Sequence, residues 1–459
     1  MQEEYMMTKL EKRYNAYYDW DFYDCDLMTE YKQCMEEGLD AESMKGLFEA
    51  ISALPRGTHR EKMADVLFEM LEDVPMRKDY AYNEPSTIAK IRALREPAPS
   101  VLPAPDPAAL PDLILGAWLG RIAGCVLGKC IEGCRTPEIK RILEVGGNLP
   151  LHRYITSQDY EKLSDDEKDR IVPPYRRLFI DQLSAAPSDD DTNYVALGQL
   201  LIEQYGRNFT PENVAALWVD RQSRNAYCTA ERVAYLNFMK GYQPPESAVY
   251  KNPYREWIGA QIRGDYFGYV NPGDPETAAD MAFRDACISH VKNGIYGEMF
   301  ASAMIAAAAA EKDLKLILRH GLAQIPCTSR LHESIRRVIS WYEEGASLEE
   351  CRKRIHTEWN EYNVHDWCHT ISNAMICAMA LLWGEGDFEK TICCAVETGF
   401  DTDCNGATVG SVIGIRNGAK QIPDKWTKPL CGKLDTTVFG VGHLDIKEAA
   451  QKTLSHLPK

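Results

Sequence analysis

The sequence predicts an all-α fold: a compact multi-helix globule with an additional helical module at the N-terminal end. Segments with apolar residues at helical spacing follow one another along the chain, and no series of alternating β segments separates them. With 45% hydrophobic and 26% charged residues, the composition is that of a folded globular protein. A chain of 459 residues is long enough for two or three domains.

Residues 1–95 are predicted to form the N-terminal helical accessory module. In segment 59–74, Met63, Val66, Leu67 and Met70 recur at helical spacing, which predicts a helix. The aromatic-rich segment 14–27 leaves two interpretations open. The module is either a cap packed on the main body or a surface for a partner or a second copy of the chain.

Residues 96–111 are predicted to be a stiff linker, because they contain six prolines and proline at this density disfavours helix and sheet. The main domain then covers residues 112–459. We expect its principal helices at 192–206, 276–291, 296–312, 370–384 and 406–419.

The charge of the chain limits its partners. With 52 basic and 68 acidic residues the net charge is −16, which disfavours nucleic acid and anionic membranes as partners.

The most apolar stretches, 113–120 and 375–383, fall short of the roughly 20 residues of a membrane-spanning helix. The fifteen cysteines show no disulfide framework, and residues 1–14 lack the apolar core of a signal peptide. We therefore expect reduced thiols, no membrane span and a cytoplasmic location.

A first acidic turn, Ser188 to Thr192, precedes an apolar helix. Ser188 and Asp191 have the spacing of a capping box, which would make the turn purely structural. However, Asp189, Asp190 and Asp191 are adjacent carboxylates that repel one another, and a cap needs only one or two of them. A hard divalent cation such as Mg²⁺ is the alternative explanation, and the turn alone does not decide between the two.

A second acidic turn, 399–406, begins another helix with Asp401 and Asp403. It imitates the start of an EF-hand, but Val412 stands where the twelfth position of that loop requires a glutamate. Glycines at four-residue intervals follow in this helix, which would allow it to approach a neighbour closely. If the fold joins the two turns, their oxygen ligands would form a binuclear metal site.

A third stretch, 120–133, has the pattern of a glycine-interrupted helix that ends in a loop with one acidic residue, Glu132. Taken alone it is weak evidence of function.

In this order, the three stretches resemble the signature of the ADP-ribosylglycohydrolase family. The family pattern is a glycine-rich helix running to G-D-A-L-G-x-x-x-E, then a T-D-D-T turn, then a late G-D-T-D-T-N turn. The matching segments here are GCVLGKCIEG, SDDDTNY and GFDTDCNGATVG, and residues 284–308 are similar to the family's central histidine-containing helix pair. The resemblance covers roughly residues 112–450 and leaves the N-terminal module outside.

The resemblance implies two bound Mg²⁺ ions, or Mn²⁺ in their place. The ligands that it implies are Asp189, Asp190, Asp191, Asp401, Asp403 and Cys404. Two cysteines depart from the family pattern: Cys125 replaces an aspartate and Cys404 replaces a threonine. A soft thiol is a poor ligand for Mg²⁺, so the second replacement puts one metal position in question.

The remaining site residues have roles in catalysis or substrate binding. The resemblance implies that Glu132 contacts the site, and Glu132, Asp190 or Asp191 would serve as general base. It also places His290 in the substrate cleft, although a lone helical histidine is otherwise most often a core residue. Asn252, Asp265 and Tyr296 are further predicted substrate contacts, the last by stacking on a base.

The predicted reaction is metal-dependent hydrolysis of a glycosidic bond at the anomeric carbon of a ribose. The resemblance implies removal of ADP-ribose from a modified side chain, such as arginine or serine, or from a small molecule. Two alternatives remain open: a hydrolase of another small N- or O-glycoside or nucleoside, and a non-catalytic binding or structural protein on the same fold.

Overall fold

The computed structural model describes residue 12 and residues 19–458. Its contacts divide the chain into two units, Met1–Ala81 with Tyr250–Tyr254, and Tyr82–Val249 with Arg255–Lys459. The division of the chain at residues 95 and 111 therefore stays a prediction. Most of segment 1–14 and the first residues of the aromatic segment 14–27 lie outside the described residues, so the expectations placed on them stay open.

The smaller unit is helical. Its helices are α1 (Leu27–Glu36), α2 (Lys45–Ser52) and α3 (Thr58–Glu72). The expected helix at 59–74 is thus present, and of its four periodic apolar residues only Leu67 is buried. Met63, Val66 and Met70 are exposed, whereas Ala64, Leu67 and Leu71 face the small core around Leu27 and Phe48. Both sets have helical spacing, so periodicity alone could not choose between them.

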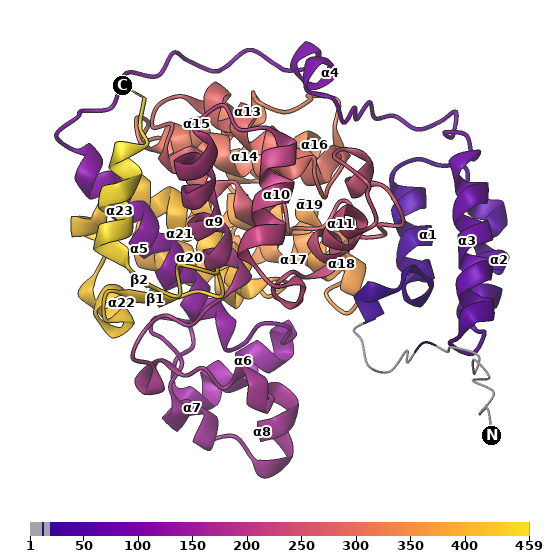
Figure 1. Cartoon of the computed structure of the whole chain (residues 1–459). Helices are drawn as coiled ribbons and strands as arrows, with labels where there is room; N and C mark the ends of the chain where they lie inside the picture. The colour runs from indigo at the N-terminus through magenta and orange to yellow at the C-terminus, as the bar shows by residue number, and fades with distance from the viewer. Residues whose placement is uncertain (1–11, 13–18, 459) are drawn as a thin grey trace, which may run out of the picture. The chain divides into compact units, whose positions relative to one another are not determined.

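The larger unit is built almost entirely from helices (Figure 1). They are α4 (Ile88–Ala93), α5 (Leu110–Lys129), α6 (Thr136–Gly146), α7 (Ser157–Glu161), α8 (Asp165–Ile171), α9 (Asp190–Tyr205), α10 (Pro211–Arg221), α11 (Thr229–Met239), α12 (Asp265–Tyr269), α13 (Pro275–Ala286), α14 (Lys292–Ala308), α15 (Leu314–Leu322), α16 (Arg330–Glu343), α17 (Leu348–Glu358), α18 (Val364–Cys368), α19 (Thr370–Trp383), α20 (Phe388–Glu397), α21 (Thr402–Asn417), α22 (Asp424–Thr427) and α23 (Ile446–Ser455). Short 3₁₀ helices such as η9 (Gln261–Arg263) connect some of them.

The all-α prediction is confirmed, because the described residues contain one small sheet: an antiparallel pair, β1 (Lys433–Asp435) and β2 (His443–Asp445). All five principal helices expected from periodicity are present, as α9, α13, α14, α19 and α21. Helix α14 is buried on every side, and so is most of α19 and α21. These three helices form the centre of the larger unit.

Helices α5 and α21 lie side by side (Figure 1), and their glycines set the distance between them. A Cβ atom added to Gly120 would lie 2.1 Å from the carbonyl oxygen of Gly410, and one added to Gly124 would lie 1.9 Å from that of Gly406. Both positions admit only hydrogen, since a backbone atom cannot move aside as a side chain does. The close approach predicted for the second glycine-rich helix is therefore confirmed.

Helix α5 corrects two expectations. It begins at Leu110, inside the predicted linker, and holds Pro111 in its first turn, where a missing N–H costs nothing. Over Leu110–Lys129 it is also long and apolar enough to cross a membrane, so the expectation that no stretch has this length was wrong. In the structure 72% of its apolar window is buried inside the protein, which is typical of a core helix.

No disulfide joins any of the fifteen cysteines, all of which lie in the described part of the chain.

Candidate functional site

The end of α5 lies against the start of α21. The Thr402 hydroxyl donates a hydrogen bond of 2.9 Å to the carbonyl oxygen of Gly128, and a Cβ atom added to Gly128 would lie 2.3 Å from the Thr402 carbonyl group. This contact places Lys129 and Glu132, which follow Gly128, next to the second acidic turn. The third sequence stretch and the second acidic turn therefore belong to one site.

The first acidic turn begins α9, but the predicted capping box between Ser188 and Asp191 is wrong. The N-cap is Asp189, whose Oδ1 accepts the backbone N–H of Asp191 at 2.9 Å. Beneath the turn, the buried guanidinium of Arg121 donates to Asp191 Oδ1 at 2.9 Å and to the Asp191 carbonyl oxygen at 2.9 Å. One cap and one arginine thus fix the orientation of two adjacent carboxylates.

The second acidic turn has an unusual backbone. Gly399 and Phe400 both have positive φ, 84° and 58°, and a bulky residue adopts this conformation only when its surroundings impose it. Asn373 holds the turn, because its Oδ1 accepts the backbone N–H of Asp401 at 3.2 Å and the side-chain amide of Asn405 at 2.8 Å. Asp401 is the N-cap of α21, yet among the described residues its carboxylate makes no capping hydrogen bond. The Asp401 carboxylate faces that of Asp403 instead.

Lys129 joins the two turns. Its ammonium group contacts Asp189 Oδ2, Glu132 Oε2 at 2.9 Å and Asp403 Oδ2 at 3.4 Å. Since Asp189 and Asp403 touch the same nitrogen, the fold brings the two acidic turns together as predicted. The Lys129 and Glu132 side chains are 22% and 34% exposed, whereas Asp189 and Asp403 are buried, so the cluster opens to solvent on the side of the lysine and Glu132.

The carboxylates of the cluster repel one another in the absence of a further cation. Burial, followed by the charges of neighbouring aspartates, raises the pKa of Asp190 and of Asp401 well above the ordinary value. Burial and Glu132 raise the pKa of Asp403 to about 7 despite Lys129. Burial also opposes ionisation of Asp189, but Lys129 outweighs it and brings that pKa below the ordinary value. Lys129 and Arg121 are thus too few cations for this set of acids.

The residues of the two turns fit a hard divalent cation. Asp191 Oδ2 and Asp403 Oδ1 are buried and have no hydrogen-bond partner among the described residues, while the other oxygen of each is held by a cation. Potential ligand atoms of Asp401, Asp403 and Cys404 lie within 4.8 Å of one another, as do those of Cys125, Asp189 and Asp191. Carboxylate oxygens are the ligands that Mg²⁺ and Mn²⁺ prefer.

The two cysteines contribute neutral thiols to this cluster. Burial, together with neighbouring aspartates, raises the pKa of both Cys125 and Cys404 well above the ordinary value for a thiol. Only a thiolate is a good metal ligand, and it favours softer ions than Mg²⁺. Cys404 is therefore near the predicted metal position but is the weakest of the predicted ligands.

The four predicted substrate contacts have protein partners of their own. Asp265 is buried and pairs with Arg121 Nη1 at 2.6 Å, so it supports the first turn from below. His290 is buried, and its Nδ1 lies 2.8 Å from the Ser289 hydroxyl; burial and Arg263 lower its pKa well below the ordinary value. The Tyr296 hydroxyl donates to the Pro85 carbonyl oxygen at 2.5 Å. Asn252 belongs to the smaller unit, where it accepts the N–H of Tyr254 at 3.2 Å. Substrate contact by these four residues stays a prediction.

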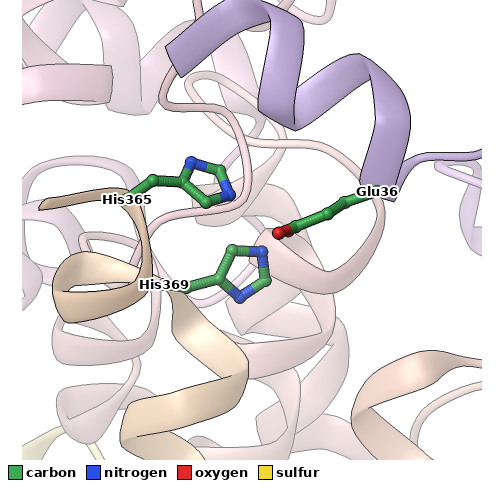
Figure 2. A group of neighbouring side chains, drawn as sticks. All are labelled: Glu36, His365 and His369. Atoms are coloured by element: carbon green, nitrogen blue, oxygen red, sulfur yellow. The ribbon is translucent and has the colours of Figure 1, made fainter. Parts of the chain in front are cut away.

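Sequence reasoning missed a pair of buried histidines, His365 on α18 and His369 at the N-cap of α19 (Figure 2). Their rings lie 5.2 Å apart between centroids. His365 Nδ1 accepts from the Trp257 indole at 3.0 Å, and His369 Nδ1 accepts the N–H of Ile371 at 3.1 Å. The carbonyl oxygen of His369 also accepts from Asn373, which in turn holds the second acidic turn. The four-residue spacing of the histidines was the available signal.

One family model and one solved structure are similar to this chain. The model of the family described as ADP-ribosylglycohydrolase matches residues 106–456. A solved structure described as an "ADP-ribosylglycohydrolase-related protein complex" is similar to the chain with 20% sequence identity and a TM-score of 0.48, over 76% of this chain and 98% of that chain. A comparison with curated proteins found no match.

Proposed function

This chain belongs to the ADP-ribosylglycohydrolase family, and from this premise we propose that it is a metal-dependent hydrolase of the glycosidic bond at the anomeric carbon of a ribose. The observation that supports the proposal most directly is the meeting of two acidic turns around Lys129, with more carboxylates than the protein's own cations can neutralise. A bound divalent cation would supply the missing positive charge, lower the pKa of a water and orient the ribose hydroxyls. Mg²⁺ is the proposed ion, with Mn²⁺ as a substitute.

The protein residues would bind the cation, hold the two acidic turns in place and accept the proton from water. Asp191, Asp401 and Asp403 present buried carboxylates to the cation, and Arg121 and Asn373 keep the two turns in place. Glu132 lies at the exposed side of the cluster, so it and Asp190 are the proposed acceptors of the proton from water. Burial of the acidic turns excludes bulk water and strengthens each of these interactions.

The proposed substrate is ADP-ribose linked to a side chain such as arginine or serine, or to a small molecule. Hydrolysis of another small N- or O-glycoside or nucleoside is the second proposal, because Cys125 and Cys404 depart from the family pattern. A non-catalytic role is disfavoured by the presence of Asp190, Asp191, Asp401, Asp403 and Glu132, since a protein without a metal site has no need to hold this many acids close together.

A chelation experiment tests the proposal. ADP-ribosyl-arginine, ADP-ribosyl-serine and a simple ribonucleoside are each incubated with the full chain, and released ADP-ribose or ribose is measured by chromatography. We expect activity with Mg²⁺ or Mn²⁺, none in excess chelator, and recovery on adding the metal back. Hydrolysis that is unchanged in excess chelator would contradict the metal-dependent mechanism, and release from the nucleoside alone would select the second proposal.

A further inference from the structure

Lys129 already occupies a cation position within the acidic cluster. Its ammonium group contacts three carboxylates from three different parts of the chain: Asp189 before α9, Glu132 after α5, and Asp403 in α21. The Lys129 side chain is 22% exposed, so these contacts hold its ammonium group within the cluster rather than in solvent. An ammonium with three donors, each directed at a carboxylate, replaces the electrostatic effect of a metal ion without its coordination.

The contacts of Lys129 remove ligands that a second metal ion would need. Both oxygens of Asp189 are engaged, Oδ1 by the N–H of Asp191 and Oδ2 by the lysine. Asp403 Oδ2 also faces the ammonium. Mg²⁺ binds oxygen at about 2.0–2.1 Å, so an ion between Asp189 and Asp403 Oδ2 would have to displace the lysine from a buried position.

The oxygens that remain suit a single ion. Asp191 Oδ2 and Asp403 Oδ1 have no hydrogen-bond partner within the described ranges. The side chain of Asp401 makes no capping hydrogen bond to the first turn of α21. Arg121 holds the Oδ1 atom of Asp191 and Lys129 holds the Oδ2 atom of Asp403, so the opposite oxygen of each carboxylate is open to an ion.

We propose that Lys129 takes the place of one of two cations, so that this chain binds one divalent ion, held by Asp191, Asp401 and Asp403. The inference rests on the proposed function, because it presupposes that the acidic turns bind a metal. It differs from the expectation drawn from the family resemblance, which implies two ions. It also removes Asp189 from the set of ligands and makes it the partner of the lysine.

Metal stoichiometry tests the proposal without relying on activity. Wild-type chain, Lys129→Met and the control Lys140→Met, at an exposed lysine of α6, are dialysed against Mn²⁺. Bound metal is counted by elemental analysis, and low-temperature electron paramagnetic resonance distinguishes isolated from spin-coupled Mn²⁺. We expect one isolated ion in the wild type and in the control, and two coupled ions in Lys129→Met.

The outcomes separate this inference from the proposed function. Two ions in the wild type would overturn the replacement by Lys129 while supporting a metal site, and no bound ion would overturn the metal site itself. A single ion in a folded Lys129→Met variant would show that the lysine is not what excludes the second ion. Because the methionine variant could fail to fold, Lys129→Arg provides a second test: it keeps the charge, so one ion is expected, and two ions would contradict the proposal.

Discussion

Two clusters in the larger unit place a cation among carboxylates, and they differ in one decisive way. Arg263 pairs with Glu231 at 2.8 Å, Asp285 at 2.5 Å and Glu298 at 3.5 Å, and it lies 4.9 Å from the ring centre of Trp218. Its side chain is 1% exposed. Lys129 also contacts three carboxylates, but its own side chain is 22% exposed and a fourth acid, Asp190, is close enough to interact with it.

The difference shows how a structural acid cluster can be told from a ligand site. Around Arg263, burial raises the pKa of Glu298 well above the ordinary value, which favours its protonated form, and the rings of Trp218 and Tyr194 cover the guanidinium. Around Lys129 the acids are more numerous, several of them stand at helix N-termini, and Glu132 opens the cluster to solvent. The first cluster is buried around its own cation and favours a proton on Glu298, whereas the second is open to solvent and has acids on two helix N-termini, which suits it to a metal ion and a substrate.

The largest expected effect comes from removing one acid of the open cluster, which is the set of carboxylates around Lys129. Asp403→Asn should abolish metal binding and lower kcat by about 10³-fold or more, because a catalytic metal contributes several kcal/mol. The metal-free variant should melt at a higher temperature than the metal-free wild type, since one member of a repelling set is neutralised. Calorimetric metal titration, turnover and thermal melting check the three parts, with the exposed Asp424→Asn as control. A variant that still binds metal normally would place the ion elsewhere.

At the closed cluster around Arg263 we expect the opposite pattern, which is a loss of stability with unchanged metal affinity. Arg263→Met should destabilise the protein by about 3–5 kcal/mol, because it leaves buried carboxylates without their cation. Its metal affinity, measured on the fraction that remains folded, should equal that of the wild type. Urea unfolding followed by tryptophan fluorescence gives the first quantity and metal titration the second. Loss of metal affinity with normal stability would mean that the two clusters are not independent.

A smaller effect on turnover is expected at the solvent side of the open cluster. Glu132→Gln should lower kcat by about 10²-fold and leave metal affinity largely intact, since it removes a proton acceptor but no proposed ligand. Metal titration in parallel with turnover separates the two effects. If the variant lost metal as completely as Asp403→Asn, Glu132 would be a ligand and the assignment of roles would have to be reversed.

The fold was largely predictable from the sequence, because its helices depend on local periodicity. The helix predicted at 192–206 is α9, and the glycines of α5 and α21 indicated that these two helices approach each other closely. The errors arose where a choice depended on distant residues. The exposed methionines of α3 have the same spacing as its buried face, and only the position of α1 and α2 decides which face is covered.

The site shows the same limit. The acidic residues of both turns were recognised, because charge before a helix is visible in the sequence. Lys129 was not recognised, because a lysine in the last turn of a helix is expected to face solvent and interact with the helix dipole. Its role appears only when α9 and α21 bring Asp189 and Asp403 to it. Arg121 is similar, since its partners Asp191 and Asp265 are distant along the chain.

The smallest expected effect tests the proton assigned to the closed cluster. Burial, strengthened by the charge of Asp285, raises the pKa of Glu298 in the folded state above its value in the unfolded chain. The folded protein therefore binds more protons than the unfolded chain once the pH exceeds the unfolded pKa, so this residue's contribution to stability is present at low pH and is lost as the pH rises. Glu298→Gln imitates the protonated form and should make the free energy of unfolding fall less steeply between pH 5 and pH 8 than in the wild type. Urea unfolding at several pH values with Mg²⁺ present measures the slope, and Glu385→Gln, at an exposed position, is the control. Equal slopes for the wild type and Glu298→Gln would mean that Glu298 is ionised beside Arg263, and the contrast between a cluster completed by a proton and one completed by a metal ion would no longer hold.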